Sequence, residues 1–236
     1  MSRIFITGDT HGDLEIYKLD SHNFPEGQKL TKDDYVIICG DFGLVWGGRQ
    51  DKIDKTLQDW LALQPWTTLF IDGNHENHDL LNEYPIEMWS GGKVHRINES
   101  IIHLMRGEIY EINQRTFFTF GGGYSIDRQY RKEGISCWQA ELPTHSEVDN
   151  ALYNLKKHGN KVDYVLTHDA PRDIKEYLGF YSGCNMRMYR DEYEDIHNAL
   201  YLLKKTIQFD EWYLGHYHID KDIGNIHILY NRIIEL

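Results

Sequence analysis

The chain has 236 residues, of which 41% are hydrophobic and 26% charged, with 5 prolines. This composition is typical of a globular protein with a buried core, and it excludes a disordered or fibrous chain. The formal net charge of −12 disfavours extended nucleic acid as a partner without excluding it, because nonspecific binding to phosphates depends on Lys and Arg. We expect a single domain over residues 1–236.

The sequence gives no sign of membrane attachment or secretion. No apolar run approaches the roughly 18 residues that cross a bilayer, and the N-terminal MSRIFITGD becomes polar before a signal-peptide core could form. We therefore expect a cytoplasmic protein with no membrane partner. Cys39, Cys137 and Cys184 are widely spaced and form no CxxC pair, so we expect reduced thiols that bind no metal.

Five short apolar runs each end abruptly in a polar residue of a metal-binding type. They are rich in β-branched and aromatic residues, as expected for strands that are buried on both faces of a sheet. The runs cover residues 4–6, 35–38, 69–71, 164–166 and 212–214. The residues that follow them are Gly-Asp, Gly-Asp, Asp-Gly-Asn-His, Thr-His-Asp and Gly-His.

Helical patterns separate these predicted strands. They cover residues 13–19, 50–63, 147–158 and about 191–205. In the last pattern Tyr193, Ile196, Leu200 and Leu203 share one helical face. Alternation of strands and helices predicts a layered α/β domain, in which ligands bind at the carboxyl ends of the strands.

The middle of the chain, from about residue 93 to 120, has a different pattern. The runs 101–104, 108–112 and 116–120 are typical of consecutive antiparallel strands with short turns, which predicts a second sheet. The segment at about 121–143 is irregular and aromatic, so we expect a surface loop or a functional lid.

Seven residues at the predicted strand ends offer metal-binding atoms. Asp9 and His11 are two residues apart, so in an extended segment both side chains point to the same side and suit one metal ion. Asp41 offers a carboxylate that could bridge two cations. Each residue taken singly could cap a turn, but the set is large enough to hold two divalent ions with positions left for water and substrate. The seven are Asp9, His11, Asp41, Asn74, His168, His216 and His218.

Five ordered motifs over nearly the whole chain resemble those of calcineurin-like metallophosphoesterases. They are Gly8-Asp9-Thr10-His11-Gly12, Gly40-Asp41, Gly73-Asn74-His75-Glu76, Thr167-His168 and Gly215-His216-Tyr217-His218. The resemblance implies a four-layer α/β/β/α sandwich, in which two mixed sheets are flanked by helices.

The resemblance also implies a role for each motif residue. One metal ion would be held by Asp9, His11 and His218, and the other by Asn74, His168 and His216. Asp41 would bridge the two ions, Asn74 would also meet the substrate, and His75 is similar to the histidine that protonates the leaving group. The implied reaction is hydrolysis of a phosphomonoester or phosphodiester by in-line attack of a metal-bound hydroxide.

The predicted ligands are oxygen and imidazole groups without thiolate. We therefore expect two divalent ions, with Mn favoured and Fe, Zn, Ni or Co as alternatives. Asp13, Glu76 and Asp169 are next to motif residues and are candidates for orienting the imidazoles, although Asp13 could instead cap a helix or turn. The other eight histidines have no such context, and we interpret them as surface or core residues.

The sequence departs from the serine/threonine protein-phosphatase branch, which its Gly-Asn-His-Glu motif otherwise resembles. That branch has a second Asp three positions after the bridging Asp, followed by Arg, whereas this chain has Leu44 and Val45. The carboxylate that would orient His75 and the arginine that would bind phosphate are therefore missing at these positions.

The loop at 121–143 contains candidate replacements. Ser125, Asp127, Arg128 and Arg131 cluster there, and an arginine among them could bind phosphate through two parallel hydrogen bonds. The alternative is that both arginines are solvated loop charges. The aromatic residues of the loop could stack on a nucleobase or could simply pack the loop onto the domain. They are Tyr124, Tyr130 and Trp138.

The leading functional hypothesis is a phosphoesterase that acts on a phosphorylated small molecule, a nucleotide or a phosphopeptide. A second hypothesis is a nuclease or a nucleic-acid-end phosphatase, which requires a basic groove that the net charge of −12 disfavours. A third is a metal-stabilised binding module with weak catalysis, suggested by the missing Asp and Arg. Retention of every predicted metal ligand and of His75 favours an enzyme.

Overall fold

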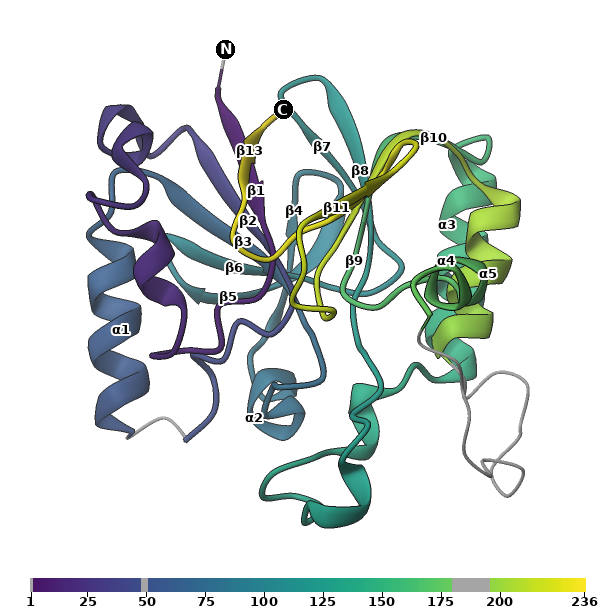
Figure 1. Ribbon diagram of the computed structural model, residues 1–236. Coiled ribbons are helices and arrows are strands. Elements are labelled where there is room, and N and C mark those ends of the chain that lie inside the picture. The colour runs from purple at the N-terminus through teal and green to yellow at the C-terminus, as the bar shows by residue number, and fades with distance from the viewer. Residues whose placement is uncertain (1, 48–50, 180–195) are drawn as a thin grey trace.

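The computed structural model describes residues 2–47, 51–179 and 196–236. Two mixed β-sheets pack face to face, and helices cover their outer faces, so that four layers are stacked (Figure 1). The four-layer α/β/β/α arrangement predicted from the sequence is thus confirmed. None of the described helices has the length and apolar character of a membrane span.

The first sheet has seven strands in the order β13-β1-β2-β3-β6-β5-β4. Neighbours from β1 through β2 and β3 to β6 are parallel, and the remaining pairings are antiparallel. The strands are β1 (Ile4–Thr7), β2 (Tyr35–Cys39), β3 (Thr67–Ile71), β4 (Ile86–Trp89), β5 (Gly92–Asn98), β6 (Ile101–Leu104) and β13 (Ile233–Glu235).

The second sheet has six strands in the order β11-β12-β10-β9-β8-β7. Here β8, β9, β10 and β12 form the parallel centre, and β7 and β11 pair antiparallel at the two edges. The strands are β7 (Ile109–Ile112), β8 (Arg115–Phe120), β9 (Lys161–Thr167), β10 (Gln208–Leu214), β11 (Lys221–Ile223) and β12 (Ile226–Ile228).

The helices lie on opposite sides of this pair of sheets. On the side of the first sheet is α1 (Lys52–Ala62), and on the side of the second are α3 (His145–Lys157), α4 (Arg172–Tyr177) and α5 (Ile196–Thr206) (Figure 1). Their starts carry clear capping signals: Asp51 accepts hydrogen bonds from the first turn of α1, and Thr144 and Glu147 form a capping box on α3. The short α2 (His78–Asn82) follows β3.

The central strands are buried on both faces, which explains their continuous apolar runs. In β2, Val36 and Ile38 pack toward the α1 side, while Ile37 and Cys39 pack between the sheets. In β9, Val165 packs against the helices of the second sheet. Three buried apolar layers therefore hold the four structural layers together.

All five predicted strands are present, but one part of the sequence prediction is wrong. Residues 101–104 form β6, which pairs parallel with β3 inside the first sheet instead of antiparallel with the next strand. All four of its residues are buried, as befits the interior of a sheet. Only β7 and β8 form the predicted antiparallel hairpin.

The predicted helices at 50–63 and 147–158 correspond to α1 and α3. The segment 13–19 forms only a short 3₁₀ helix, η1 (Ile16–Leu19), after a turn, and η2 (Pro25–Lys29) follows it. Helix α5 matches the last prediction from Ile196 onward. The earlier part of that predicted range, with Tyr193, lies outside the described residues, and so does Cys184. The loop at 121–143 holds two short 3₁₀ helices, η3 (Arg128–Tyr130) and η4 (Gln139–Glu141), and extends away from the sheets (Figure 1).

Candidate metal centre

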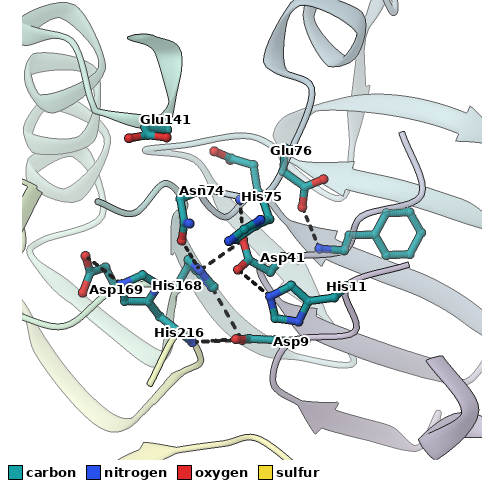
Figure 2. A network of polar contacts seen from close by, with 12 residues as sticks. Asp9, His11, Asp41, Asn74, His75, Glu76, Glu141, His168, Asp169 and His216 are labelled. Atoms are coloured by element: carbon teal, nitrogen blue, oxygen red, sulfur yellow. Dashed lines mark hydrogen bonds and ion pairs between the residues drawn. The ribbon is translucent and has the colours of Figure 1, made fainter. Parts of the chain in front are cut away.

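The carboxyl ends of β1, β2, β3, β9 and β10 bring the predicted ligands together. Figure 2 shows the side chains that follow these strands pointing toward one another from both sheets. Three groups of side chains place ligand atoms within 4.8 Å of one another, and Asp41 and His11 each belong to two groups. The groups are Asp9, His11 and His218; His11, Asp41 and His75; and Asp41, His168 and His216.

Hydrogen bonds orient His168 and Asn74, two of the ligands predicted for the second ion. His168 Nδ1–H donates to the carbonyl of Cys39 (2.9 Å), so that Nε2 faces Asn74 Oδ1 (3.1 Å) and Asp41 Oδ1 (3.3 Å). The Asn74 amide donates to Ser125 Oγ (3.1 Å), which leaves its oxygen directed at the site. These contacts fix which donor atom each side chain presents.

The convergence does not come from the extended alternation that the sequence suggested. His11 and Asp41 have positive φ angles of 40° and 46°, and His216 and His218 have 68° and 50°. The backbone therefore turns at these residues instead of running as a strand. Non-glycine residues rarely adopt this left-handed conformation, and it concentrates at functional sites.

The motif glycines allow the loops to approach one another. A Cβ atom at Gly73 would lie 2.1 Å from Asp41 Oδ1, and one at Gly215 would lie 2.1 Å from Asp9 Oδ1. Neither position has room for a side chain. Both glycines thus keep the backbone against the two central carboxylates.

Asp9 and Asp41 keep their negative charges in the buried site. Burial alone would raise the pKa values of Asp9 and Asp41, but nearby imidazoles outweigh it: His218 and His168 lower the pKa of Asp9, and His168 and His11 hold that of Asp41 well below its usual range. Both residues are therefore ionised although at most 1% exposed.

The imidazoles respond to these charges. Burial lowers the pKa of His11, but Asp41, Asp9 and Glu15 outweigh it and raise the pKa to about 9. Asp41 and Asp9 likewise overcome burial and raise the pKa of His168 to about 10. Without metal the site thus gathers protons, and a divalent cation would supply the same positive charge, so the donor set fits metal ions.

His75 lies at the edge of this cluster, against the 121–143 loop. Its backbone N–H donates to Asp41 Oδ1 (2.7 Å), and its ring centroid is 5.2 Å from that of His11. The Arg131 guanidinium contacts both ring nitrogens, at 3.1 Å from Nε2 and 3.4 Å from Nδ1. Burial and the charge of Arg131 lower the pKa of His75, and Asp41 opposes them.

The two candidate arginines have different surroundings. Arg131 is held by Asp127, 2.7 Å away, and reaches His75. Arg128 donates to Glu141 (2.6 Å) and Glu133 (2.9 Å), so its described side-chain contacts lie within the loop itself. The structure thus brings Arg131, and not Arg128, to the predicted catalytic histidine.

The aromatic candidates also differ from one another. Trp138 is 3% exposed, packs edge-on against Trp46 and donates its indole N–H to Asp79 (3.0 Å). Tyr124 packs partly against the core of the second sheet, and Tyr130 is exposed. Trp138 therefore packs the loop onto the domain, as in the alternative reading of the sequence.

The residues next to the motifs take three different roles. Asp169 accepts a hydrogen bond from Tyr217 Oη (2.7 Å) and lies 3.8 Å from His216 Nε2. Glu76 orients no ring; it accepts hydrogen bonds from the backbone N–H groups of Phe42 (2.6 Å) and Gly43 (3.3 Å), which follow Asp41. Asp13 is exposed and does not cap η1.

Sequence reasoning missed Glu15, Lys18 and Tyr230. Glu15 accepts a hydrogen bond from His11 Nδ1 (2.8 Å), and Lys18 Nζ donates to the carbonyls of Asp9 and Tyr230. The sequence held one signal for Glu15, its spacing of four residues from His11. Two side chains at this spacing can meet across one helical turn. Nothing in the local sequence marks Tyr230, because Glu15 and Lys18, which it contacts, are more than 200 positions away.

One family model matches most of this chain, and the chain spans only part of the length of its curated relatives. A family model described as calcineurin-like phosphoesterase matches residues 2–220. Lariat debranching enzyme A of Xenopus laevis is 26% identical over 92% of this chain and 43% of its own length. The lariat debranching enzymes of Homo sapiens and Arabidopsis thaliana are 25% and 26% identical over 74% and 92% of this chain. This chain spans 34% and 54% of their lengths.

Among solved structures, a putative 5'-nucleotidase from Staphylococcus aureus in complex with alpha-ketoglutarate aligns with 97% of this chain and 48% of its own. The TM-score is 0.49 and the sequence identity 16%.

Proposed function

This chain belongs to the calcineurin-like phosphoesterase family, and we propose that it is a metal-dependent phosphoesterase with two divalent ions. The observation that supports this most directly is the cluster of three overlapping groups of Asp and His side chains that share Asp41 and His11. We also infer that the whole chain forms one domain, since both sheets contribute to this cluster.

We assign the metal ligands as the motifs imply. In this proposal Asp41 contributes to both positions. Asp9, His11 and His218 hold one ion, and Asn74, His168 and His216 hold the other. When bound, the two cations would neutralise charge on the phosphoryl oxygens and activate a water molecule for attack. The chemistry of the ligands allows Mn, Fe, Zn, Ni or Co.

His75 is proposed as the general acid that protonates the leaving oxygen. Its backbone contact with Asp41 and its place between His11 and Arg131 hold the ring at the edge of the cluster. In the substrate-free site, burial and Arg131 lower its pKa and so disfavour the protonated ring. A phosphoryl anion bound to Arg131 would offset that positive charge and help His75 hold the proton it must donate.

Arg131 is proposed as the residue that binds a phosphoryl oxygen. It replaces the arginine that the protein-phosphatase branch carries after the bridging Asp, a position filled here by the buried Val45. Asp127 and the carbonyl of Ser136 restrain the guanidinium, and its other N–H groups can form charge-assisted hydrogen bonds to phosphate. The environment of Arg128 favours a structural role in the loop.

The relatives favour a phosphodiester substrate over a phosphoprotein. They are named for debranching lariats, a name that refers to a nucleic-acid linkage. This supports the nuclease hypothesis for a short or branched nucleic-acid segment, whereas the net charge of −12 still disfavours a long phosphate footprint. A binding module without turnover is disfavoured because His75 and all seven predicted ligands are positioned together.

Hydrolysis of paired generic substrates tests the proposal. Metal-stripped protein would be reconstituted with Mn, Zn, Ni or Mg and assayed with a nitrophenyl monoester and a bis-nitrophenyl diester. We expect metal-dependent release of nitrophenol, with the diester preferred. Protein that binds two ions but releases no nitrophenol with any metal would contradict the enzyme and favour a binding module.

A further inference from the structure

Residues outside the five motifs contact the first group of predicted ligands. His11 Nδ1–H donates to Glu15 Oε2 (2.8 Å), and Tyr230 Oη donates to Glu15 Oε1 (2.9 Å). Each carboxylate oxygen of Glu15 thus has its own partner. Because Nδ1 of His11 is engaged, Nε2 is the nitrogen that faces Asp41, at 3.1 Å from Oδ2.

Tyr230 also contacts the second imidazole of this group. Its ring is stacked on His218, with centroids 4.7 Å apart and ring planes 8° from parallel. The His218 side chain is 49% exposed, so the surrounding core restricts it little, and its Nε2 lies 3.1 Å from Asp9 Oδ2. One tyrosine therefore contacts His218 directly and His11 through Glu15.

The segment that carries Tyr230 is fixed against the loop of Asp9. Lys18 is buried, and its Nζ donates to the backbone carbonyls of Gly8 (3.0 Å), Asp9 (2.5 Å) and Tyr230 (2.7 Å). A Cβ atom at Gly8 would lie 1.9 Å from the carbonyl oxygen of Leu229. The backbone on both sides of the tyrosine ring is thus held in place by close contacts.

We propose that Glu15 and Tyr230 are positioning residues that hold His11 and His218 in the orientation needed to bind one divalent cation. A carboxylate bonded to the far nitrogen of a metal-binding imidazole fixes the ring and raises its basicity. Tyr230 lies beyond the matched residues 2–220, so the family model does not account for it. The inference rests on the metal centre of the proposed function, but on neither its substrate nor its turnover.

Isothermal titration of metal-stripped protein with Mn²⁺ tests the proposal. Glu15→Gln removes the charge, while Tyr230→Phe keeps the ring on His218 and removes only the hydroxyl. Tyr17→Phe is the matched control, because Tyr17 lies on η1 and is exposed. We expect Glu15→Gln to weaken the binding of one of the two ions by about 10- to 100-fold, and Tyr230→Phe to weaken the binding of the same ion by a smaller factor. The affinity for the other ion should not change in either variant, and Tyr17→Phe should bind both ions as wild type does.

Long-range ¹H–¹⁵N spectra of the Zn²⁺-loaded protein give an independent signature. Wild type should show a proton on Nδ1 of His11, and Glu15→Gln should shift or broaden that resonance. Circular dichroism and the Tm of each metal-free variant would establish that it is folded. Unchanged affinities for both ions in Glu15→Gln and Tyr230→Phe, or a wild type that binds no ions, would overturn the proposal. Two bound ions with no hydrolysis would contradict only the proposed function.

Discussion

The guanidinium of Arg131 lies 3.1 Å from Nε2 of His75, although the two residues are 56 positions apart. Arg131 belongs to the irregular loop, whereas His75 belongs to a motif loop that follows β3. Trp46 approaches the same imidazole, with ring planes 28° from parallel and centroids 6.5 Å apart. The loop therefore supplies a positive charge next to the cluster of predicted metal ligands, to which the motifs contribute carboxylates, an amide and imidazoles.

Replacing Arg131 by Gln should lower kcat/KM while metal binding stays intact. The guanidinium would meet a phosphoryl oxygen, and loss of a charge-assisted contact of about 1.5–3 kcal/mol corresponds to roughly 10- to 200-fold in rate. Steady-state kinetics with the diester would measure the loss. Lys132→Gln is the control, since it removes the same charge from an exposed neighbour. Equal kinetics for Arg131→Gln and wild type would show that Arg131 does not bind the substrate.

Replacing His75 by Ala should lower kcat by about 10²- to 10⁴-fold, as expected for loss of a general acid. The loss should depend on the leaving group. Nitrophenolate departs readily without a proton, so the defect should be small for nitrophenyl esters and large for alkyl or ribose esters. Rates for a series of leaving groups would be compared at saturating metal. A defect of the same size across the series would argue against proton donation by His75.

Asp41→Asn should weaken the binding of both ions. Asn keeps the shape of the side chain and tolerates the left-handed conformation at this position, where φ is 46°, but it lacks the negative charge. Loss of a residue that only hydrogen-bonds to a metal ligand typically lowers metal affinity by about 10- to 100-fold. Loss of a ligand shared by both ions should therefore lower the affinity for each ion by at least this factor. Metal titration would be compared with Asp13→Asn, an exposed carboxylate in the neighbouring loop. Two ions bound with wild-type affinity would exclude a bridging role.

The fold was predictable where local pattern and tertiary environment agree. Strands such as Tyr35–Cys39 are apolar on both faces because they are buried on both faces, and the sequence shows this directly. The strand Ile101–Leu104 has the same apolar character, but which sheet a strand joins is decided by long-range pairing with β3. A short, mostly apolar run carries no information about that partner.

In the site, too, the local sequence marks some residues, whereas long-range contacts decide the role of others. The seven predicted ligands are marked by residue type and by their place at strand ends, and the structure brings their side chains together. Arg128 and Arg131 look equivalent in sequence, but their contacts in the fold differ. Arg128 forms an ion pair with Glu141, whereas Arg131 contacts His75. Tyr230 was missed because its proposed role depends on contacts with Glu15 and His218 that sequence spacing does not reveal.

His78 should make the protein less stable below neutral pH. It is 4% exposed, and its Nε2 has no hydrogen-bond partner among the described residues. Burial and the charge of Arg106 lower its pKa from 6.5 to about 4, against the opposing charge of Asp72. Between pH 6.5 and 4 the unfolded state therefore binds more protons than the folded state, so the free energy of unfolding falls as the pH falls.

The contribution of His78 to this loss should reach about 3 kcal/mol at pH 4, because each unit of pKa shift corresponds to about 1.4 kcal/mol. Urea unfolding of metal-free protein at several pH values between 4 and 7.5 would measure it. In His78→Leu the free energy of unfolding should change less steeply with pH, by an amount that corresponds to up to one fewer proton taken up on unfolding. In His22→Gln, which alters an exposed histidine, the pH dependence should match wild type. The apolar side chain also removes the buried ring nitrogen, so the variant should lose less stability than wild type on acidification even if it starts lower at pH 7.5. Parallel pH profiles for His78→Leu and wild type would show that another group titrates in this range.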